Sequence, residues 1–174
     1  MIEDKGKGYI SGISGPVVFA RGNQRLGMLE MVYVGQNRLV GEVISIENDK
    51  AVIQVYESTT GLRIGEPVES TGSPLSVNLG PGIIGEVFDG IQRPLYELVK
   101  MSGTLIEKGV FAPAPDIKKK WSVKILAKPG DDVYPGTIIA ETEETPSILH
   151  RVMIPNGVQG KVTRVVSNGE YTIE

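Results

Sequence analysis

Cysteine is absent from the 174-residue sequence, and His150 is its only histidine. The absence of cysteine excludes disulfide bonds, thiolate catalysis and cysteine-ligated metal sites. One histidine cannot build a site from several imidazoles, and no nucleophile-elbow motif supports a Ser–His pair. The acidic stretches Asp131–Asp132 and Glu141–Glu144 lack the spacing of a calcium loop. We therefore predict no metal site, interpret these carboxylates as solvated hairpin ends, and place His150 on a strand.

Long apolar runs and an excess of basic residues are also missing. No run approaches the roughly 20 apolar residues of a membrane helix, and Met1–Gly8 is too polar for a signal peptide. The net charge is −3 and aromatic residues make up 6%, whereas nucleic-acid binders usually carry a basic face. We interpret Lys118–Lys120 beside Trp121 as a solvated strand entry. The expectation is a soluble, cytoplasmic protein with no nucleic-acid partner.

The phosphate-binding loop G-x-x-x-x-G-K-[ST] is absent from the sequence. Its two Gly-Lys pairs, Gly6-Lys7 and Gly160-Lys161, are not followed by Ser or Thr. Gly80–Gly85 matches G-x-G-x-x-G, but Pro81 has no N–H to offer a phosphate and Gly90 interrupts any following helix. We interpret this motif as a tight turn at a domain junction. The sequence predicts no catalytic and no cofactor-binding residues within this chain.

Glycine is abundant, with 22 residues against a usual share of ~7%, and 11 prolines accompany it. Scattered glycines between short apolar runs indicate many tight turns joining short strands. Residues 9–68 fit about six strands, which suggests a small closed barrel. Its clearest unit is a hairpin of residues 43–47 and 50–56 around Asn48-Asp49. We expect its inward-facing side chains to be Ile44, Ile46, Ala51, Ile53 and Val55.

One helix and a second β region follow the barrel. Pro94 and Gly103 bracket a helical spacing of Leu95, Leu98, Val99 and Met101. Residues 121–126 and 148–153 read as strands, and residues 160–166 and 171–173 as a hairpin through Asn168-Gly169.

The predicted fold class is mainly β, with an N-terminal β-barrel and a second all-β module of barrel/sandwich-hybrid type joined by a mixed segment with one helix. The expected domains are residues 1–74, 75–110 and 111–174. Ala112–Pro115 resembles a boundary linker, so we expect the last domain to fold as its own unit.

Two other functions fit parts of this pattern. Residues 128–142 and 154–162 resemble the repeated turns of lipoyl and biotinyl carrier domains, which need a lysine at an exposed hairpin tip. The stretch between them, residues 143–152, contains no lysine, so a carrier fold without carrier chemistry is expected. The other alternative is an oligonucleotide-binding β-barrel.

Three motifs carry a closer resemblance that runs in order along the whole chain. Tyr9–Val18, Thr59–Val68 and Leu75–Leu95 resemble the opening strand, the barrel end and the barrel-to-core crossing of the catalytic A subunit of archaeal/vacuolar-type rotary ATPases. Residues 109–174 look like the large insertion of that protein. The non-catalytic B subunit, the flagellar export ATPase and the F-type β subunit share the barrel but lack this insertion.

The resemblance implies a hexamer of alternating A and B subunits, with a central rotor, a peripheral stator and, indirectly, a membrane ion-translocating sector. The intact protein is then an ATPase or ATP synthase that binds ATP or ADP with Mg²⁺ on the cytoplasmic face of a membrane, coupled to proton or sodium translocation. The phosphate-binding loop lies beyond residue 174 in that family. This segment is expected to be inactive by itself, its barrel joining the hexamer crown and its insertion facing stator components.

The resemblance also implies that residues 75–108 lack their usual partners here. Each large apolar side chain left in water forgoes about 1.5–3 kcal/mol of burial. We expect this stretch to dock on one of the β-modules, with some self-association. The apolar side chains concerned are Ile83, Ile84, Val87, Phe88, Leu95, Leu98 and Val99.

Overall fold

A computed structural model describes residues 7–22, 26–103 and 105–173. The chain forms two compact units: one contains the residues up to 77 together with 88–112, and the other contains residues 78–87 together with 113–174. The prediction of no signal peptide was made on Met1–Gly8, and most of this stretch lies outside the described residues. Among the described residues, no helix has the length and hydropathy of a membrane span.

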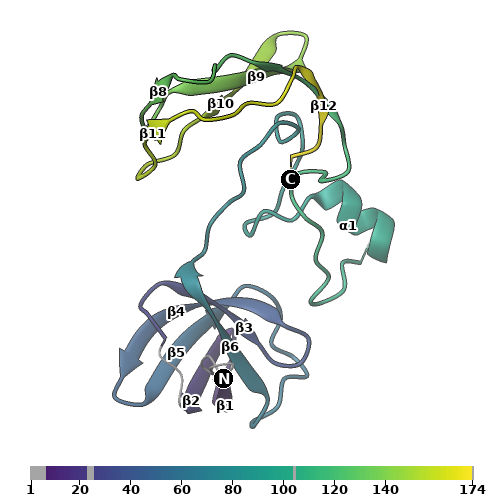
Figure 1. Ribbon diagram of the computed structural model, residues 1–174. Helices are drawn as coiled ribbons and strands as arrows, with labels where there is room; N and C mark the ends of the chain where they lie inside the picture. Colours follow the sequence, from purple (N-terminus) through teal and green to yellow (C-terminus); the bar gives the residue numbers. More distant parts are fainter. Residues whose placement is uncertain (1–6, 23–25, 104, 174) are drawn as a thin grey trace. The chain divides into compact units, whose positions relative to one another are not determined.

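The first unit is built on a closed barrel with the strand order β1-β2-β5-β4-β3-β6 (Figure 1). All neighbouring strands pair antiparallel, and closure leaves no strand edge unpaired. The predicted six-strand barrel is therefore confirmed. The strands are β1 (Lys7–Ser14), β2 (Val17–Gly22), β3 (Glu30–Val34), β4 (Leu39–Glu47), β5 (Lys50–Val55) and β6 (Pro67–Pro74).

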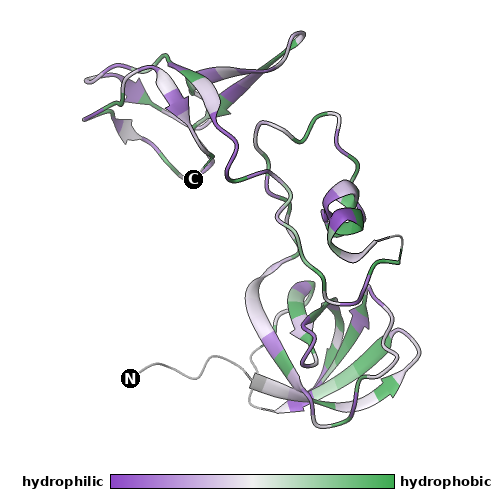
Figure 2. Ribbon diagram, turned by 90° about the vertical axis from the view of Figure 1, so that its right-hand side faces the viewer, coloured by the Kyte–Doolittle hydropathy of each residue, from purple (hydrophilic) through white to green (hydrophobic). Residues whose placement is uncertain are grey.

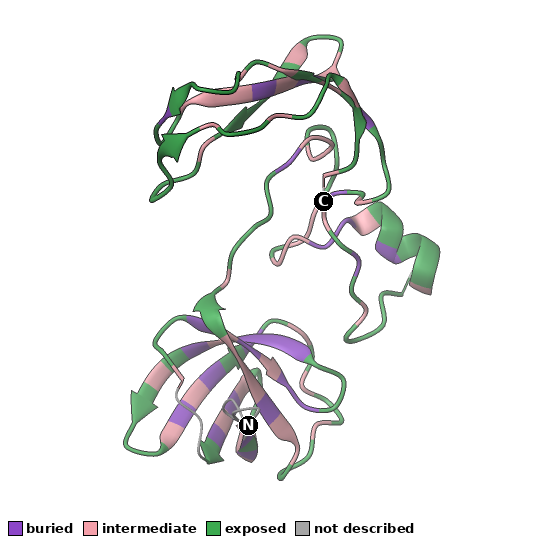
Figure 3. Cartoon of the chain, in the orientation of Figure 1, coloured by how far each residue is buried: buried purple, intermediate pink, exposed green. Residues whose placement is uncertain are grey.

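Alternating burial along the strands fills the barrel interior. Successive side chains of a strand point to opposite faces, so every second residue of β3, of β5 and of the first four residues of β2 is buried (Figure 3). Apolar residues are frequent along the barrel strands (Figure 2), and residues 17–20 of β2 and 51–53 of β5 are continuous apolar runs. The interior is almost entirely aliphatic and consists of Ile10, Val18, Ala20, Val32, Val34, Leu39, Val43, Ala51, Ile53, Val55 and Val68.

The β4–β5 hairpin has the predicted turn but only part of the predicted core. Glu47 pairs with Lys50, and Asn48 adopts a φ of 55°, as a two-residue turn requires. On β5, Ala51, Ile53 and Val55 are buried as expected. The prediction for β4 was wrong: Val43 faces inward opposite Ile53, so Ile44 lies on the outer face, and Ile46 is exposed beyond an irregularity in the pairing.

Glu30 is the buried charged residue of the barrel wall. Its carboxylate accepts hydrogen bonds from the N–H of Gly27 at 2.6 Å, the N–H of Gly72 at 2.8 Å and the hydroxyl of Ser70. Burial alone would raise the pKa of this carboxyl, but these donors outweigh it and hold the pKa below its usual range. Glu30 thereby joins the loop before β3 to the irregular end of β6.

The predicted helix is confirmed as α1 (Leu95–Ser102), in the first unit. Pro94 precedes it in an extended conformation, and Gly103 ends it with a φ of 75° while its N–H donates to the carbonyl of Val99 at 2.8 Å. Leu98 is fully buried, whereas Val99 and Met101 remain exposed. The helix is therefore docked through a narrow stripe.

The second unit contains a four-stranded antiparallel sheet of order β10-β9-β7-β12 and a two-stranded sheet of β11 and β8. The strands predicted at 121–126 and 148–153 are confirmed as β7 and β10. The fold is thus mainly β in both units, as predicted. The strands are β7 (Trp121–Ile125), β8 (Asp132–Val133), β9 (Ile138–Thr145), β10 (Ile148–Met153), β11 (Gly160–Lys161) and β12 (Gly169–Tyr171).

The hairpin predicted around Asn168-Gly169 was wrong. β12 pairs with β7, and β11 pairs with β8. The Asn168 side chain has a different use, because its Oδ1 accepts a hydrogen bond from the N–H of Ile125 at 2.8 Å. Tertiary pairing with β7 has therefore overridden a local turn signal.

Residues 75–108 are divided between the two units. Residues 88–112 pack with the barrel, and residues 78–87 pack with the second unit. The expected docking is thus found, but on both units rather than on one, with Leu98 fully buried. Ile84 and Val87 remain about half exposed (51% each), as does Val99 (46%), and self-association through them stays a prediction.

We predict that Glu30→Gln lowers the free energy of unfolding at pH 7 by about 1.5–3 kcal/mol, because it weakens hydrogen bonds to a charged acceptor. The pKa of Glu30 is lower in the folded state than in the unfolded state. Its carboxylate therefore stabilises the fold fully above the unfolded-state pKa, and this stabilisation is lost as the pH falls through the folded-state pKa. Urea unfolding of the unsubstituted chain and of Glu30→Gln, from pH 7 downward, measures the difference in their free energies of unfolding. This difference should become smaller toward low pH. The exposed Glu47→Gln is the control; an equal effect of both substitutions would contradict the prediction.

Candidate functional site

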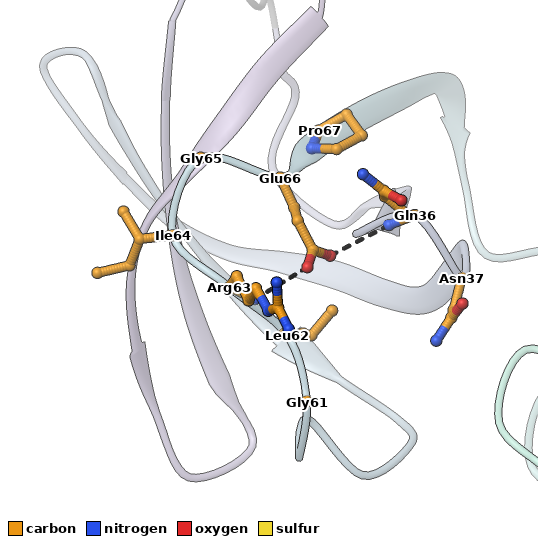
Figure 4. A pocket seen from close by; sticks show the side chains of 9 residues that line it. All are labelled: Gln36, Asn37, Gly61, Leu62, Arg63, Ile64, Gly65, Glu66 and Pro67. Atoms are coloured by element: carbon orange, nitrogen blue, oxygen red, sulfur yellow. Dashed lines mark hydrogen bonds between the residues drawn. The ribbon is translucent and has the colours of Figure 1, made fainter.

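The motif at residues 59–68 forms a loop that closes one end of the barrel and lines an open hollow of about 490 Å³ (Figure 4). Glu66 organises it: one carboxylate oxygen accepts from the N–H of Gln36 at 3.2 Å and the other from the N–H of Arg63 at 3.1 Å. The hydroxyl of Thr59 donates to the carbonyl of Gly15 at 2.6 Å. The loop is therefore pinned to two different strand connections.

The hollow has the composition of a contact surface. Its lining offers amide, guanidinium and carboxylate groups from Gln36, Asn37, Arg63 and Glu66, but no imidazole, thiol or hydroxyl nucleophile. In Figure 4 the Ile64 side chain points away from Glu66, and it is largely exposed. An exposed aliphatic side chain beside polar groups suits contact with another protein surface.

A buried ion cluster around Arg93 ties the segment after the barrel back onto it. The guanidinium contacts the carboxylates of Asp89 at 2.7 Å and Glu57 at 3.2 Å, and donates to the carbonyl of Val110 at 3.1 Å. Glu57 also accepts from the N–H of Gly109 at 3.1 Å. Gly109 lies so close to the barrel that a Cβ there would be 2.3 Å from the carbonyl oxygen of Asn37.

The electrostatics of this cluster favour the charged forms. Burial alone would raise the pKa of Asp89, but the N–H groups of Arg93 and Ile91 and the Arg93 guanidinium outweigh it and lower the pKa. For Arg93 the signs are reversed: burial alone would lower the pKa of its guanidinium, but the neighbouring carboxylates of Asp89 and Glu57 outweigh burial and raise that pKa. The side chains of Arg93 and Glu57 are about 90% buried. The cluster therefore holds the segment after the barrel in place and acts as a structural lock, beside a small cavity of about 200 Å³ that Glu57 and Arg93 help to line.

A second lock lies in the other unit, at the Gly80–Gly85 turn. The N–H groups of Gly82 and Ile84 both donate to one carboxylate oxygen of Glu144, at 2.7 and 3.0 Å. The expected turn is confirmed: residues 81–82 and 84–85 are turns, and no helix begins before Leu95 in this stretch. The expectation of a solvated Glu144 was wrong: its side chain is 2% exposed because the turn covers it.

The remaining singled-out residues lie apart from one another. His150 is on β10 as predicted, 3.6 Å from Glu144. Glu141 pairs with Lys124 and Asp132 lies 3.8 Å from Lys161, so neither belongs to a carboxylate cluster. Within the described residues, no group of three or more His, Asp or Glu side chains suits a metal ion. The β9–β10 turn, Pro146-Ser147, offers no lysine for a carrier arm.

Two family models match the chain. One, described as the ATP synthase alpha/beta family beta-barrel domain, covers residues 10–72, and another, the ATP synthase alpha/beta subunit barrel-sandwich domain, covers residues 112–174. A V-type ATP synthase alpha chain 2 of Clostridium tetani is 52% identical over 96% of this chain. A V-type ATP synthase alpha chain of Halothermothrix orenii is 51% identical, and the A subunit of an A-type ATP synthase from Methanopyrus kandleri is 49% identical, each over 97%.

The chain corresponds to the N-terminal domains of the V/A-type ATP synthase A (alpha) subunit. It spans 28% of the length of each of these three relatives. The resemblance inferred from the three motifs is therefore confirmed. In the barrel and the barrel-sandwich module, those motifs form the pinned loop at 59–68 and the two locked turns around Gly82 and Arg93.

Sequence reasoning missed Glu30, Glu57 and Glu144 as organising residues. Each accepts backbone hydrogen bonds from chain positions about 40–60 residues away. No local pattern marks such a carboxylate, because an acidic residue on a strand is equally compatible with solvent. A glycine-rich segment without its own strand pairing was the available signal, since its N–H groups need acceptors.

We predict that Arg93→Leu lowers the free energy of unfolding of the first unit by about 3–5 kcal/mol, because Asp89 and Glu57 would keep buried charges without a counterion. Urea unfolding together with amide hydrogen exchange at Gly109 measures this loss. Arg21→Leu is the matched control, because Arg21 forms a half-exposed pair with Asp49 at 3.9 Å and should cost under about 1 kcal/mol. Similar stabilities of the two variants would refute the lock.

Proposed function

We propose that this chain supplies the structural N-terminal part of the catalytic A subunit of an archaeal/vacuolar-type rotary ATPase. The observation that carries the proposal is the order of a barrel and a barrel-sandwich module at about 50% identity over nearly the whole chain. The intact protein would couple ATP synthesis or hydrolysis to proton or sodium translocation. It would act as a peripheral component on the cytoplasmic face of a membrane-bound complex.

The barrel is proposed to join a crown of alternating A and B subunits. A closed barrel resists deformation and offers no strand edge, so its contacts with neighbours must use side chains. Ile44, on the outer face of β4, and Ile46, near the end of that strand, are exposed and aliphatic, which supports a protein contact there. The barrel would stay fixed while other parts of the protein move, and the Arg93 lock would hold the segment after the barrel against it.

The second unit is proposed to contact the peripheral stator, with the central rotor elsewhere in the complex. The β10 strand forms one edge of its sheet and exposes Leu149, Val152 and Met153. Apolar side chains on a sheet edge suit a partner protein. ATP or ADP with Mg²⁺ would be held by residues of the intact protein other than those of this chain.

We predict that this chain does not bind Mg-ATP, because the sequence lacks a phosphate-binding loop. Calorimetric titration should give no saturable heat at millimolar ligand, whereas an intact A subunit titrated in parallel should bind. A micromolar dissociation constant for the chain would contradict this prediction.

We further predict that Ile44→Glu weakens co-assembly with the B subunit, and that Met153→Glu weakens binding of stator subunits. Each replaces an exposed apolar contact with a charge on a different unit, so each variant is the control for the other. Native mass spectrometry of the chain mixed with the B subunit or with stator subunits measures both effects. If Ile44→Glu still assembles with the B subunit as the unsubstituted chain does, the barrel interface is wrong. If Met153→Glu still binds stator subunits equally well, the interface on β10 is wrong.

A further inference from the structure

The Gly80–Gly85 turn is a binding site for a carboxylate within this chain. Gly82 has a φ of 100°, which turns its N–H toward the same point as the N–H of Ile84. Successive N–H groups arranged in this way form a concave anion-binding nest. The occupant is one oxygen of Glu144, contributed by β9 from 62 residues further along the chain.

The second oxygen of Glu144 faces the only histidine. His150 Nδ1 lies 3.6 Å from it, on the neighbouring strand β10, and a quarter of the His150 side chain is exposed. The buried carboxylate therefore has permanent donors on one side and a titratable donor on the other. Histidine is the side chain that ordinarily changes charge between pH 5 and 8.

We propose that Glu144 is a latch that holds the turn at residues 80–86 on the barrel-sandwich module, and that protonation of His150 tightens it. With neutral His150, two backbone N–H groups hold the carboxylate, and the imidazole beside it carries no charge. With charged His150, an ion pair is added on the open side of the carboxylate. Stronger acid reverses the effect, because a protonated Glu144 is a weaker acceptor.

The depressed pKa of Glu144 agrees with this geometry. Burial alone would raise that pKa, and the N–H groups of Ile84 and Gly82 together with His150 lower it. Among the described residues, His150 is the cationic side chain within 4 Å of this carboxylate. The adjoining elements carry further charges: Glu86 on the turn, Glu141 and Glu143 on β9, Arg151 on β10, and Lys119 and Lys120 before β7.

Trp121 provides a built-in reporter of the latch. A Cβ on Gly82 would lie 3.0 Å from Cζ2 of the Trp121 ring, so the turn packs directly against the indole. Trp121 is buried and is the only tryptophan of the chain. Release of the turn would therefore expose the indole to solvent.

The test is amide hydrogen exchange at Gly82 and Ile84 in the whole chain, at several pH values between about 8 and 5.5, with each rate divided by its intrinsic value. In the unsubstituted chain, protection should rise about two- to fivefold toward acid, as expected for one partly exposed ion pair. His150→Gln should remove this rise. Glu144→Gln should lower protection at every pH by about tenfold and move Trp121 emission to longer wavelength.

Glu143→Gln is the matched control, because it removes an exposed carboxylate next to Glu144 on the same strand. It should leave both the protection and its pH dependence unchanged. Amides of Val123 and Ala140, in the paired strands β7 and β9 of the same unit, show whether each variant remains folded. Unchanged protection in Glu144→Gln would overturn the latch, and an unchanged pH response in His150→Gln would overturn the role of His150.

Discussion

Irregular backbone needs hydrogen-bond acceptors, and in this chain buried or partly buried carboxylates supply them. Glu30, Glu66, Asp89 and Glu144 each accept from two backbone N–H groups in loops. A charged acceptor forms a stronger hydrogen bond than a neutral one, so one side chain can fix a turn that has no strand partner. In the barrel and in the sheet, backbone N–H groups are paired with the carbonyls of neighbouring strands. In the loops and turns, these carboxylates accept from the backbone N–H groups instead.

The same arrangement explains why the segment after the barrel is ordered in two parts. Asp89, Arg93 and Glu57 secure residues 88–112 within the barrel unit. Glu144 secures the Gly82 turn within the other unit. Among the described aliphatic and aromatic side chains of residues 78–112, prolines aside, Leu98 and Ala112 are buried and the others are half-buried or exposed, so burial alone is a weak hold on this segment. Charge-assisted hydrogen bonds replace a hydrophobic core in this region.

Much of the regular structure could be predicted, because its signals are local. The Asn48 turn lies between two strands rich in β-branched residues, and the predicted hairpin is found there. Pro94 and Gly103 mark the two ends of α1, and the predicted helix is found between them. The Asn168-Gly169 signal was equally strong but failed, since the Asn168 side chain binds the backbone of Ile125, 43 residues earlier. The Arg93 and Glu144 locks are equally hard to predict from the sequence, because their residues come together only in the tertiary fold.

The two locks differ in what would release them, and this difference bears on function. Arg93 remains charged at any physiological pH, so its cluster responds to mechanical or packing changes. Glu144 lies beside His150 and a turn of only a few residues, and its hold on that turn is proposed to vary with pH. In a protein whose barrel is proposed to stay fixed in a crown while other parts move, a permanent lock suits the barrel. An adjustable one suits the module proposed to face the stator.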